Sequence, residues 1–332
     1  MVALALLHGC AAAGPRRAAT PPAPALTTTE ADVAADDATL HTWTRGGGAR
    51  SPVLVLINGG PGLSHESMDP LQDALATPSL RVLTYDQRGV GRSVAGGTGP
   101  FKPADYVEDL EALRRSTGQE RVHLLGHSFG GMVVLSYLDR YPQRVASLIL
   151  VGTGVSDPTT MRSGGERLAA RVAELQRSGL IPDPIPREGC SEKFAAVLPA
   201  YVADPKRPVP EPMRRRTCDT SGRSSVLGAF IDTPYGRGVE TSTAPALVLY
   251  GERDPFGPGP SRFAASALTH APVERAELPA CGHLGWLECE GIFLERVRRF
   301  LRTHVPPSGA PPPRNALSVR GSAPDTPEKR SQ

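Results

Sequence analysis

Residues 124–131 read Leu-Leu-Gly-His-Ser-Phe-Gly-Gly, and this stretch decides the fold. The apolar run 122–125 predicts a strand, and 132–140 predicts a helix. Between them lies a Gly-x-Ser-x-Gly pattern, in which Ser128 stands on a sharp turn with its hydroxyl clear of the sheet. The glycines are needed because a Cβ there would meet the neighbouring strand or helix. Taken alone, the pattern also fits a glycine-rich turn without chemistry.

Apolar runs alternate with helix-like segments on both sides of this turn. The other predicted strands are 53–57, 81–85, 145–151, 246–250 and 273–278, and the other predicted helices are 64–76, 106–115 and 291–304. Residues 31–50 predict one or two edge strands. The continuous apolar run 53–57 is typical of a parallel strand that is buried on both faces. The alternation predicts an α/β fold with a mostly parallel central sheet and helices on both faces.

The alternation stops between residues 153 and 243, where two predicted helical pieces, 166–177 and 191–203, are separated by prolines. We expect this segment to be a helical cap inserted above the carboxyl ends of the strands, where ligands bind in such sheets. The core then comprises 31–152 and 244–304. Residues 1–30 and 305–332 are rich in Ala, Pro, Thr, Gly or Ser, and we expect a disordered leader and tail.

Composition limits the classes of partner. The chain has 332 residues and a net charge of +3, with Arg214-Arg215-Arg216 as its densest basic cluster. We interpret that cluster as a solvated face and expect no nucleic-acid partner. No stretch approaches the roughly 20 apolar residues of a membrane-spanning helix.

The N-terminus leaves the localisation open. Residues 7–10 read Leu-His-Gly-Cys, which resembles the cleavage box of bacterial lipoproteins and predicts a lipid anchor at Cys10. However, the preceding apolar run is short and has no basic residues before it, so an ordinary leader is the alternative. Export, as a lipoprotein or a periplasmic or secreted protein, and a cytoplasmic location are both retained.

The remaining cysteines are Cys190, Cys218, Cys281 and Cys289. In an exported protein an even number fits disulfides, for example Cys190–Cys218, and four buried thiols are the alternative. The chain has no Cys-x-x-Cys pattern, so we expect neither a zinc site nor a redox motif. No metal and no cofactor is expected.

Two downstream loops supply the partners that a serine nucleophile needs, a base and an acid that orients it. Asp254 follows the strand 246–250, and His283 follows the strand 273–278. The order Ser128, Asp254, His283 matches a known arrangement of such triads. Glu252 is the alternative acid, and His127 is expected to pack beside the nucleophile.

The oxyanion of the transition state needs two N–H donors. The residue after the nucleophile, Phe129, supplies one. Gly60, in the loop Asn58-Gly59-Gly60-Pro61-Gly62, is our choice for the other, because Pro61 has no N–H.

Four motifs together resemble the proline iminopeptidase branch of the α/β-hydrolase superfamily. They are Asn58-Gly59-Gly60-Pro61-Gly62, Asp86-Gln87-Arg88-Gly89-Val90-Gly91-Arg92-Ser93, Gly126-His127-Ser128-Phe129-Gly130-Gly131 and Gly282-His283. The resemblance implies an α/β-hydrolase fold, serine hydrolysis, and a structural role for Asp86 and Arg88 in pinning loops beneath the site.

The sequence departs from the family in two places. Asn58 replaces the family's histidine at the start of the glycine loop. The family also has a Trp-rich cap helix with a glutamate that grips the substrate's amine, whereas the tryptophans here, Trp43 and Trp286, lie outside the cap. None of the acids in the cap can be assigned that role.

The resulting prediction is a serine hydrolase that cleaves amide bonds of small or short peptide substrates with free N-termini, through an acyl-enzyme. A carboxylesterase or lactonase on the same fold is the alternative, and a non-catalytic binding protein is a weaker one. The substrate side chain and the oligomeric state are left open.

Overall fold

The structure is a computed structural model that describes residues 26–186, 189–208, 210–219 and 221–305. The predicted lipid anchor at Cys10, most of the predicted leader and the predicted tail from 306 onward lie outside these residues. The first strand begins at Thr28, inside the range predicted as leader.

A nine-stranded sheet forms the centre of the molecule, with β1-β2-β4-β3-β6-β7-β8-β9 as its order and β5 paired to β2. The pairs from β4 to β9 are parallel, and the pairs made by β2 are antiparallel. The strands are β1 (Thr28–Ala34), β2 (Ala38–Arg45), β3 (Val53–Ile57), β4 (Arg81–Tyr85), β5 (Val94–Ala95), β6 (Val122–His127), β7 (Val145–Val151), β8 (Ala246–Gly251) and β9 (Val273–Leu278). The predicted mostly parallel sheet is confirmed.

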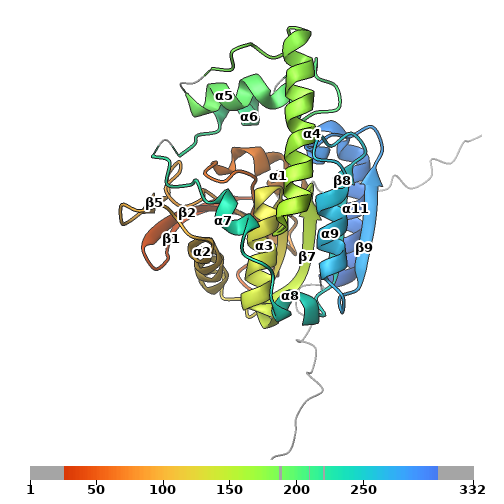
Figure 1. Cartoon of the computed structure of the whole chain (residues 1–332). Coiled ribbons are helices and arrows are strands. Elements are labelled where there is room, and N and C mark those ends of the chain that lie inside the picture. Colours follow the sequence, from red (N-terminus) through yellow and green to blue (C-terminus); the bar gives the residue numbers. More distant parts are fainter. Residues whose placement is uncertain (1–25, 187–188, 209, 220, 306–332) are drawn as a thin grey trace, which may run out of the picture.

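Helices cover both faces of this sheet (Figure 1). One face packs against α2 (Pro103–Ser116), α3 (Phe129–Arg140), α8 (Arg237–Thr241) and α9 (Gly259–Ala267). The other packs against α1 (Asp69–Leu75) and α11 (Glu290–His304), with the short α10 (Gly285–Glu288) at its upper end. Strand β3 shows the two faces in sequence, because Val53, Val55 and Ile57 belong to the first core whereas Leu54 and Leu56 belong to the second. This two-sided burial explains its continuous apolar run.

The segment between β7 and β8 contains five α-helices among its described residues. The long helix α4 (Pro158–Arg177), α5 (Cys190–Val197) and α6 (Glu211–Arg215) lie above the sheet edge, and α7 (Leu227–Ile231) and α8 lead back along the body (Figure 1). Leu175, Ile181 and Ala200 form a small core of their own in the upper part. We refer to residues 158–219, from α4 to the loop after α6, as the cap.

Two single-turn helices complete the core and the cap, η1 (His65–Met68) before α1 and η3 (Leu198–Ala200) after α5, and η2 (Pro142–Arg144) leads into β7. No described helix combines the length and the apolar character that crossing a bilayer requires.

Candidate active site

Ser128 lies on the turn between β6 and α3 in a strained backbone conformation. Its φ and ψ are 54° and −119°, a combination that residues with a side chain rarely adopt. The turn is tight because glycines flank it: a Cβ on Gly126 would lie 2.5 Å from the carbonyl oxygen of Gly130, and one on Gly130 would lie 2.2 Å from that of Ile57. The tight turn imposes this conformation and places the serine at the end of the strand, where the sequence pattern predicted it.

His283 and Asp254 meet at the carboxyl ends of β8 and β9, which pair in parallel. Nδ1 of His283 lies 2.8 Å from Oδ2 of Asp254, and both side chains are buried. Oδ1 of Asp254 accepts a hydrogen bond from the N–H of Phe256 at 2.9 Å. Within the described residues, Nε2 of His283 has no hydrogen-bond partner. The acid thus orients the imidazole and leaves one nitrogen for a reacting group.

The end of β7 leaves room for this pair. Gly152 follows β7 with φ +49°, and a Cβ there would lie 2.9 Å from Nδ1 of His283 and 3.1 Å from Oδ2 of Asp254. Glycine lets the pair sit directly against the backbone beside the serine turn.

Neither of the other two residues considered from the sequence, Glu252 and His127, is hydrogen-bonded to the ring nitrogens of His283. Glu252 is exposed and accepts a hydrogen bond from the N–H of Ala280 at 2.8 Å, so Asp254 is the acid that contacts His283. His127 is buried, and its Nε2 lies 3.1 Å from the carbonyl oxygen of His283. Burial and the nearby His283 hold the pKa of His127 well below its usual range, so its ring is neutral and packs as expected.

Two N–H groups are available for an oxyanion. Phe129 is the first residue of α3, where an N–H has no partner within the helix. Gly60 has φ +144°, and its N–H donates to none of the other described residues. The loop that holds Gly60 is fixed by Asn58, whose Nδ2 donates to three carbonyl groups of residues 59–64 at 2.8–3.1 Å. Asparagine thus anchors this loop in the place of the family's histidine.

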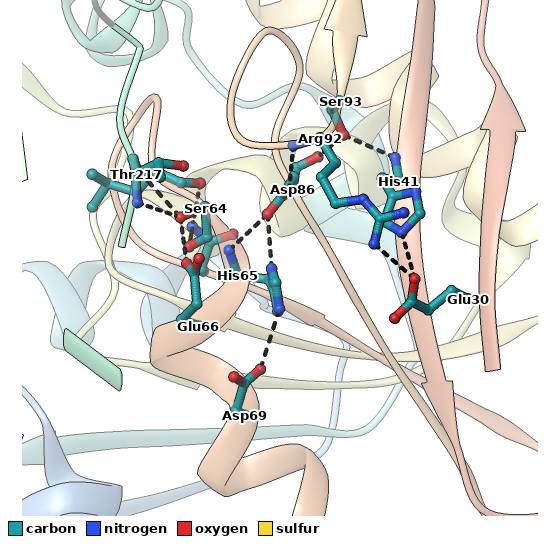
Figure 2. Close-up of polar contacts among 12 residues, drawn as sticks. Glu30, His41, Ser64, His65, Glu66, Asp69, Asp86, Arg92, Ser93 and Thr217 are labelled. Atoms are coloured by element: carbon teal, nitrogen blue, oxygen red, sulfur yellow. Dashed lines mark hydrogen bonds and ion pairs between the residues drawn. The ribbon is translucent and has the colours of Figure 1, made fainter. Parts of the chain in front are cut away.

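Gln87 and Asp86 hold the glycine loop and the segment after it, as predicted for Asp86, whereas Arg88 binds α2. Gln87 accepts from the N–H of Gly62 at 2.8 Å. Asp86 accepts from the N–H and the ring Nδ1 of His65, at 3.1 and 2.8 Å (Figure 2). Arg88 is buried and pairs with Asp109 through two bonds of 2.9 and 2.8 Å. None of these side chains lines the cavity described below, so their role is structural.

The cap is hydrogen-bonded to the segment after the glycine loop and to the loop that holds His283. Ser64 and Thr217 exchange hydrogen bonds, with the N–H of Thr217 donating to Oγ of Ser64 at 2.7 Å and the N–H of Ser64 donating to the carbonyl of Thr217 at 3.1 Å (Figure 2). On the other side, the N–H of His283 donates to the carbonyl of Tyr201 at 2.8 Å. The cap therefore holds the glycine loop and the histidine loop together.

A cavity of about 250 Å³ lies between the cap and the sheet edge. Ser128, His283 and Gly60 line it from the core, and the cap contributes mainly apolar side chains such as Phe194 and Tyr201. No Asp or Glu of the described residues lines it. Such a cavity fits a small, largely apolar substrate.

A disulfide braces the histidine loop. Cys281 and Cys289 are bonded, with Cα atoms 6.0 Å apart, and the closed loop contains His283. The alternative of buried free thiols is therefore wrong for these two residues. Cys218 is also disulfide-bonded. The predicted pair Cys190–Cys218 involves the side chain of Cys190, which is outside those described.

Sequence reasoning missed two residues that line the cavity. Trp286 donates from Nε1 to the carbonyl of Ser67 at 3.0 Å and packs edge-on against His127, and its position three residues after His283 was the available signal. Arg216 was assigned to a solvated face. That prediction was wrong, because its side chain is buried and lines the cavity, whereas its neighbour Arg214 is exposed.

Comparison with known proteins gives consistent matches. Residues 52–288 match the model of the alpha/beta hydrolase fold family. A proline iminopeptidase of Lactobacillus helveticus is 39% identical over 287 residues, which cover 80% of this chain and 95% of the relative. The crystal structure of a proline iminopeptidase-related protein from Thermus thermophilus superposes with a TM-score of 0.62 at 29% identity, covering 84% of this chain and 99% of that one. An esterase from Thermogutta terrifontis shares the fold, with a TM-score of 0.59 at 21% identity over 84% of this chain and all (100%) of that one.

Proposed function

Because this chain belongs to the α/β-hydrolase family and to its proline iminopeptidase-like branch, we propose that it hydrolyses an amide or ester bond through an acyl-enzyme on Ser128. The observation that supports the proposal is the hydrogen bonding of the two ring nitrogens of His283. Its Nδ1 is held by Asp254 at 2.8 Å, and its Nε2 has no partner among the described residues. Ser128 and His283 line one cavity.

In the proposed mechanism, Oγ of Ser128 attacks the carbonyl carbon of the substrate while Nε2 of His283 takes the hydroxyl proton. Asp254 stabilises the imidazolium that forms and fixes its tautomer. The N–H groups of Gly60 and Phe129 hold the oxyanion. His283 then protonates the leaving amine or alcohol, and a water molecule, activated by the same imidazole, releases the acid.

The similarity to proline iminopeptidases supports an amide substrate with a free N-terminal amine, which in proline is a secondary amine. A second candidate, an ester or lactone substrate, is favoured by the cavity itself. Without an acidic side chain among its described lining residues, the cavity offers no counter-ion for an ammonium group.

The first test is a substrate panel with an S128A control. Prolyl-4-nitroanilide, its N-acetyl derivative and 4-nitrophenyl butanoate separate the two substrate classes. S128A should lower kcat by roughly three to six orders of magnitude on every active substrate, because the nucleophile is lost. Labelling by a fluorophosphonate should disappear in the same variant. Turnover that survives in S128A would reject the mechanism.

A further inference from the structure

One charged side chain in the cavity has no role in the mechanism above. Arg216 follows α6 in the cap, is 7% exposed, and lines the same cavity as Ser128 and His283. Among the described lining residues it is the only Asp, Glu, Lys or Arg. Its charge also acts on His127, the residue before the nucleophile, which puts the guanidinium within electrostatic range of the reacting centre.

The protein does not neutralise this cation. Within the described residues Arg216 forms no ion pair, and its one side-chain hydrogen bond runs from Nε to the carbonyl of Met213 at 3.2 Å. Its guanidinium lies over the ring of Phe194, 5.3 Å from the centroid. The two terminal nitrogens, Nη1 and Nη2, have no acceptor in the described part of the chain. They are the nitrogens that bind a carboxylate in a paired, two-bond geometry.

Arg216 keeps its positive charge although its side chain is buried. Burial lowers the pKa of Arg216 to about 10, although the negative charge of Glu66 acts to raise it. The guanidinium therefore still carries its charge at neutral pH. Glu66 accepts a hydrogen bond from Ser64 instead of pairing with Arg216 (Figure 2). An unpaired buried charge is destabilising unless an anion enters to compensate it.

The backbone holds Arg216 firmly in position. Its own carbonyl accepts from Oγ of Ser191 at 2.5 Å, and the next residue, Thr217, exchanges hydrogen bonds with Ser64 in the glycine loop (Figure 2). Together with the hydrogen bond from Nε to Met213, these backbone bonds link the guanidinium to the segment that follows the loop supplying Gly60. A fixed distance between a charge and an oxyanion hole is what selects one substrate length.

We propose that Arg216 is a specificity-determining residue that binds a carboxylate of the substrate, so the preferred substrates are small apolar molecules carrying both a cleavable carbonyl and a free acid group. This rests on the proposed function, because it concerns the same cavity. Two kinds of molecule supply that chemistry: a short peptide with a free C-terminus, in which the acid leaves with the amine, and a half-ester of a dicarboxylic acid, in which the acid stays on the acyl group.

The test compares pairs of substrates in which one member has a carboxylate and the other has an uncharged group in its place. Pro-Ala against its C-terminal amide probes the leaving group, and 4-nitrophenyl hemisuccinate against 4-nitrophenyl butanoate probes the acyl group. A charge-assisted pair predicts that kcat/KM favours the acid in one of the two pairs by roughly ten- to a hundredfold. R216Q should abolish that ratio, R216K should keep part of it, and the exposed neighbour variant R214Q should leave it unchanged. The pair that shows the ratio identifies the source of the carboxylate.

A binding measurement separates this inference from the catalytic proposal. In the S128A background, 4-phenylbutanoate should bind at least roughly tenfold tighter than 4-phenylbutanamide by calorimetry, and S128A/R216Q should bind both equally. This result stands even if S128A retains turnover and the mechanism fails. Equal binding of acid and amide by S128A, or a fall in R216Q of the same factor for both members of a pair, would overturn the role of Arg216.

Discussion

Asp254 and Glu252 stand two residues apart on the same loop after β8, yet their surroundings give them different chemistry. Asp254 is buried, accepts from the N–H of Phe256 and meets His283 at 2.8 Å. Glu252 is exposed and accepts from the N–H of Ala280. A catalytic acid has to orient the base, so only the first of them fits that role.

This difference makes a matched pair of variants. D254N should lower kcat by about three to four orders of magnitude, because an amide cannot favour the tautomer that leaves Nε2 free to take a proton. E252Q keeps an acceptor for the N–H of Ala280 and should leave kcat within about twofold, as expected for an exposed side chain. Steady-state assays on one substrate check both variants. A large loss in E252Q with little change in D254N would assign the acid to the other residue.

At this scale the sequence predicted that Ser128, Asp254 and His283 lie at the ends of strands, and it did not predict that Arg216 lines the cavity. Ser128, Asp254 and His283 each follow a strand, so their convergence at one sheet edge could be predicted from the alternating pattern. Arg216 lies in a stretch with no periodicity beside an exposed arginine, and only the folded cap shows that it is buried. Contacts between distant segments, such as Thr217 with Ser64, leave no local pattern to detect.

At the scale of elements, a hydrogen bond between His65 and Asp86 joins η1 to the loop that follows β4. Burial alone would lower the pKa of His65. The hydrogen bond to Asp86 and the charges of Asp86, Asp69 and Glu66 outweigh it and raise the pKa above 6.5 (Figure 2). The ring of His65 also stacks on Trp43 of β2, with centroids 3.6 Å apart. His65 thus joins η1 to Asp86 at the end of β4 and to Trp43 of β2.

The sign of the pKa shift gives a pH dependence of stability. A raised folded-state pKa means that this stabilisation is complete below the unfolded pKa of 6.5 and is lost as the pH rises through the folded pKa. The free energy of unfolding of the wild type, minus that of H65Q, should therefore decrease from pH 6 to pH 9. Urea denaturation of both proteins measures it. A difference that grows with pH would contradict the assignment.

Helix and strand limits show where sequence patterns work. Strands 53–57, 81–85 and 145–151 match their predicted limits because buried parallel strands are rich in apolar residues on both faces. Helix α4 begins at Pro158, well before the predicted helical piece 166–177. Gly164 and Gly165 weaken its helical pattern. Phe256, in the loop after β8, packs against Gly164, and the sequence gives no sign of this contact.

At the scale of the whole molecule, hydrogen bonds join the cap to the core on both sides of the cavity. Ser64 is the centre of the contact on the glycine-loop side, and residues 63 and 218 pair beside it as an isolated antiparallel bridge. On the histidine side, Glu288 accepts from the N–H groups of Ala203 and Gly282. The cap is thus an integral wall of the site.

Ser64 tests this arrangement. S64A leaves the N–H of Thr217 without its acceptor, which should lower the free energy of unfolding by about 1–3 kcal/mol. It should also lower kcat/KM, because the loop that carries Gly60 is less firmly held. S266A removes an exposed hydroxyl that donates to the carbonyl of Phe263. It should change the free energy of unfolding by no more than about 0.5 kcal/mol and leave kcat/KM unchanged. Calorimetric melting and steady-state assays give the comparison, and S64A behaving like S266A would argue against a coupled cap.

The bonds between Thr217 and Ser64 also impose a size filter on the reaction rate. A molecule longer than the cavity has to displace part of its wall. Where it displaces Arg216 and Thr217, the hydrogen bonds to Ser64 transmit the movement to the backbone that presents Gly60. Compounds that are too large therefore react slowly for two reasons. They fit the cavity poorly, and the displaced N–H of Gly60 stabilises the oxyanion less well. Chain length is selected in turnover even where affinity alone would tolerate it.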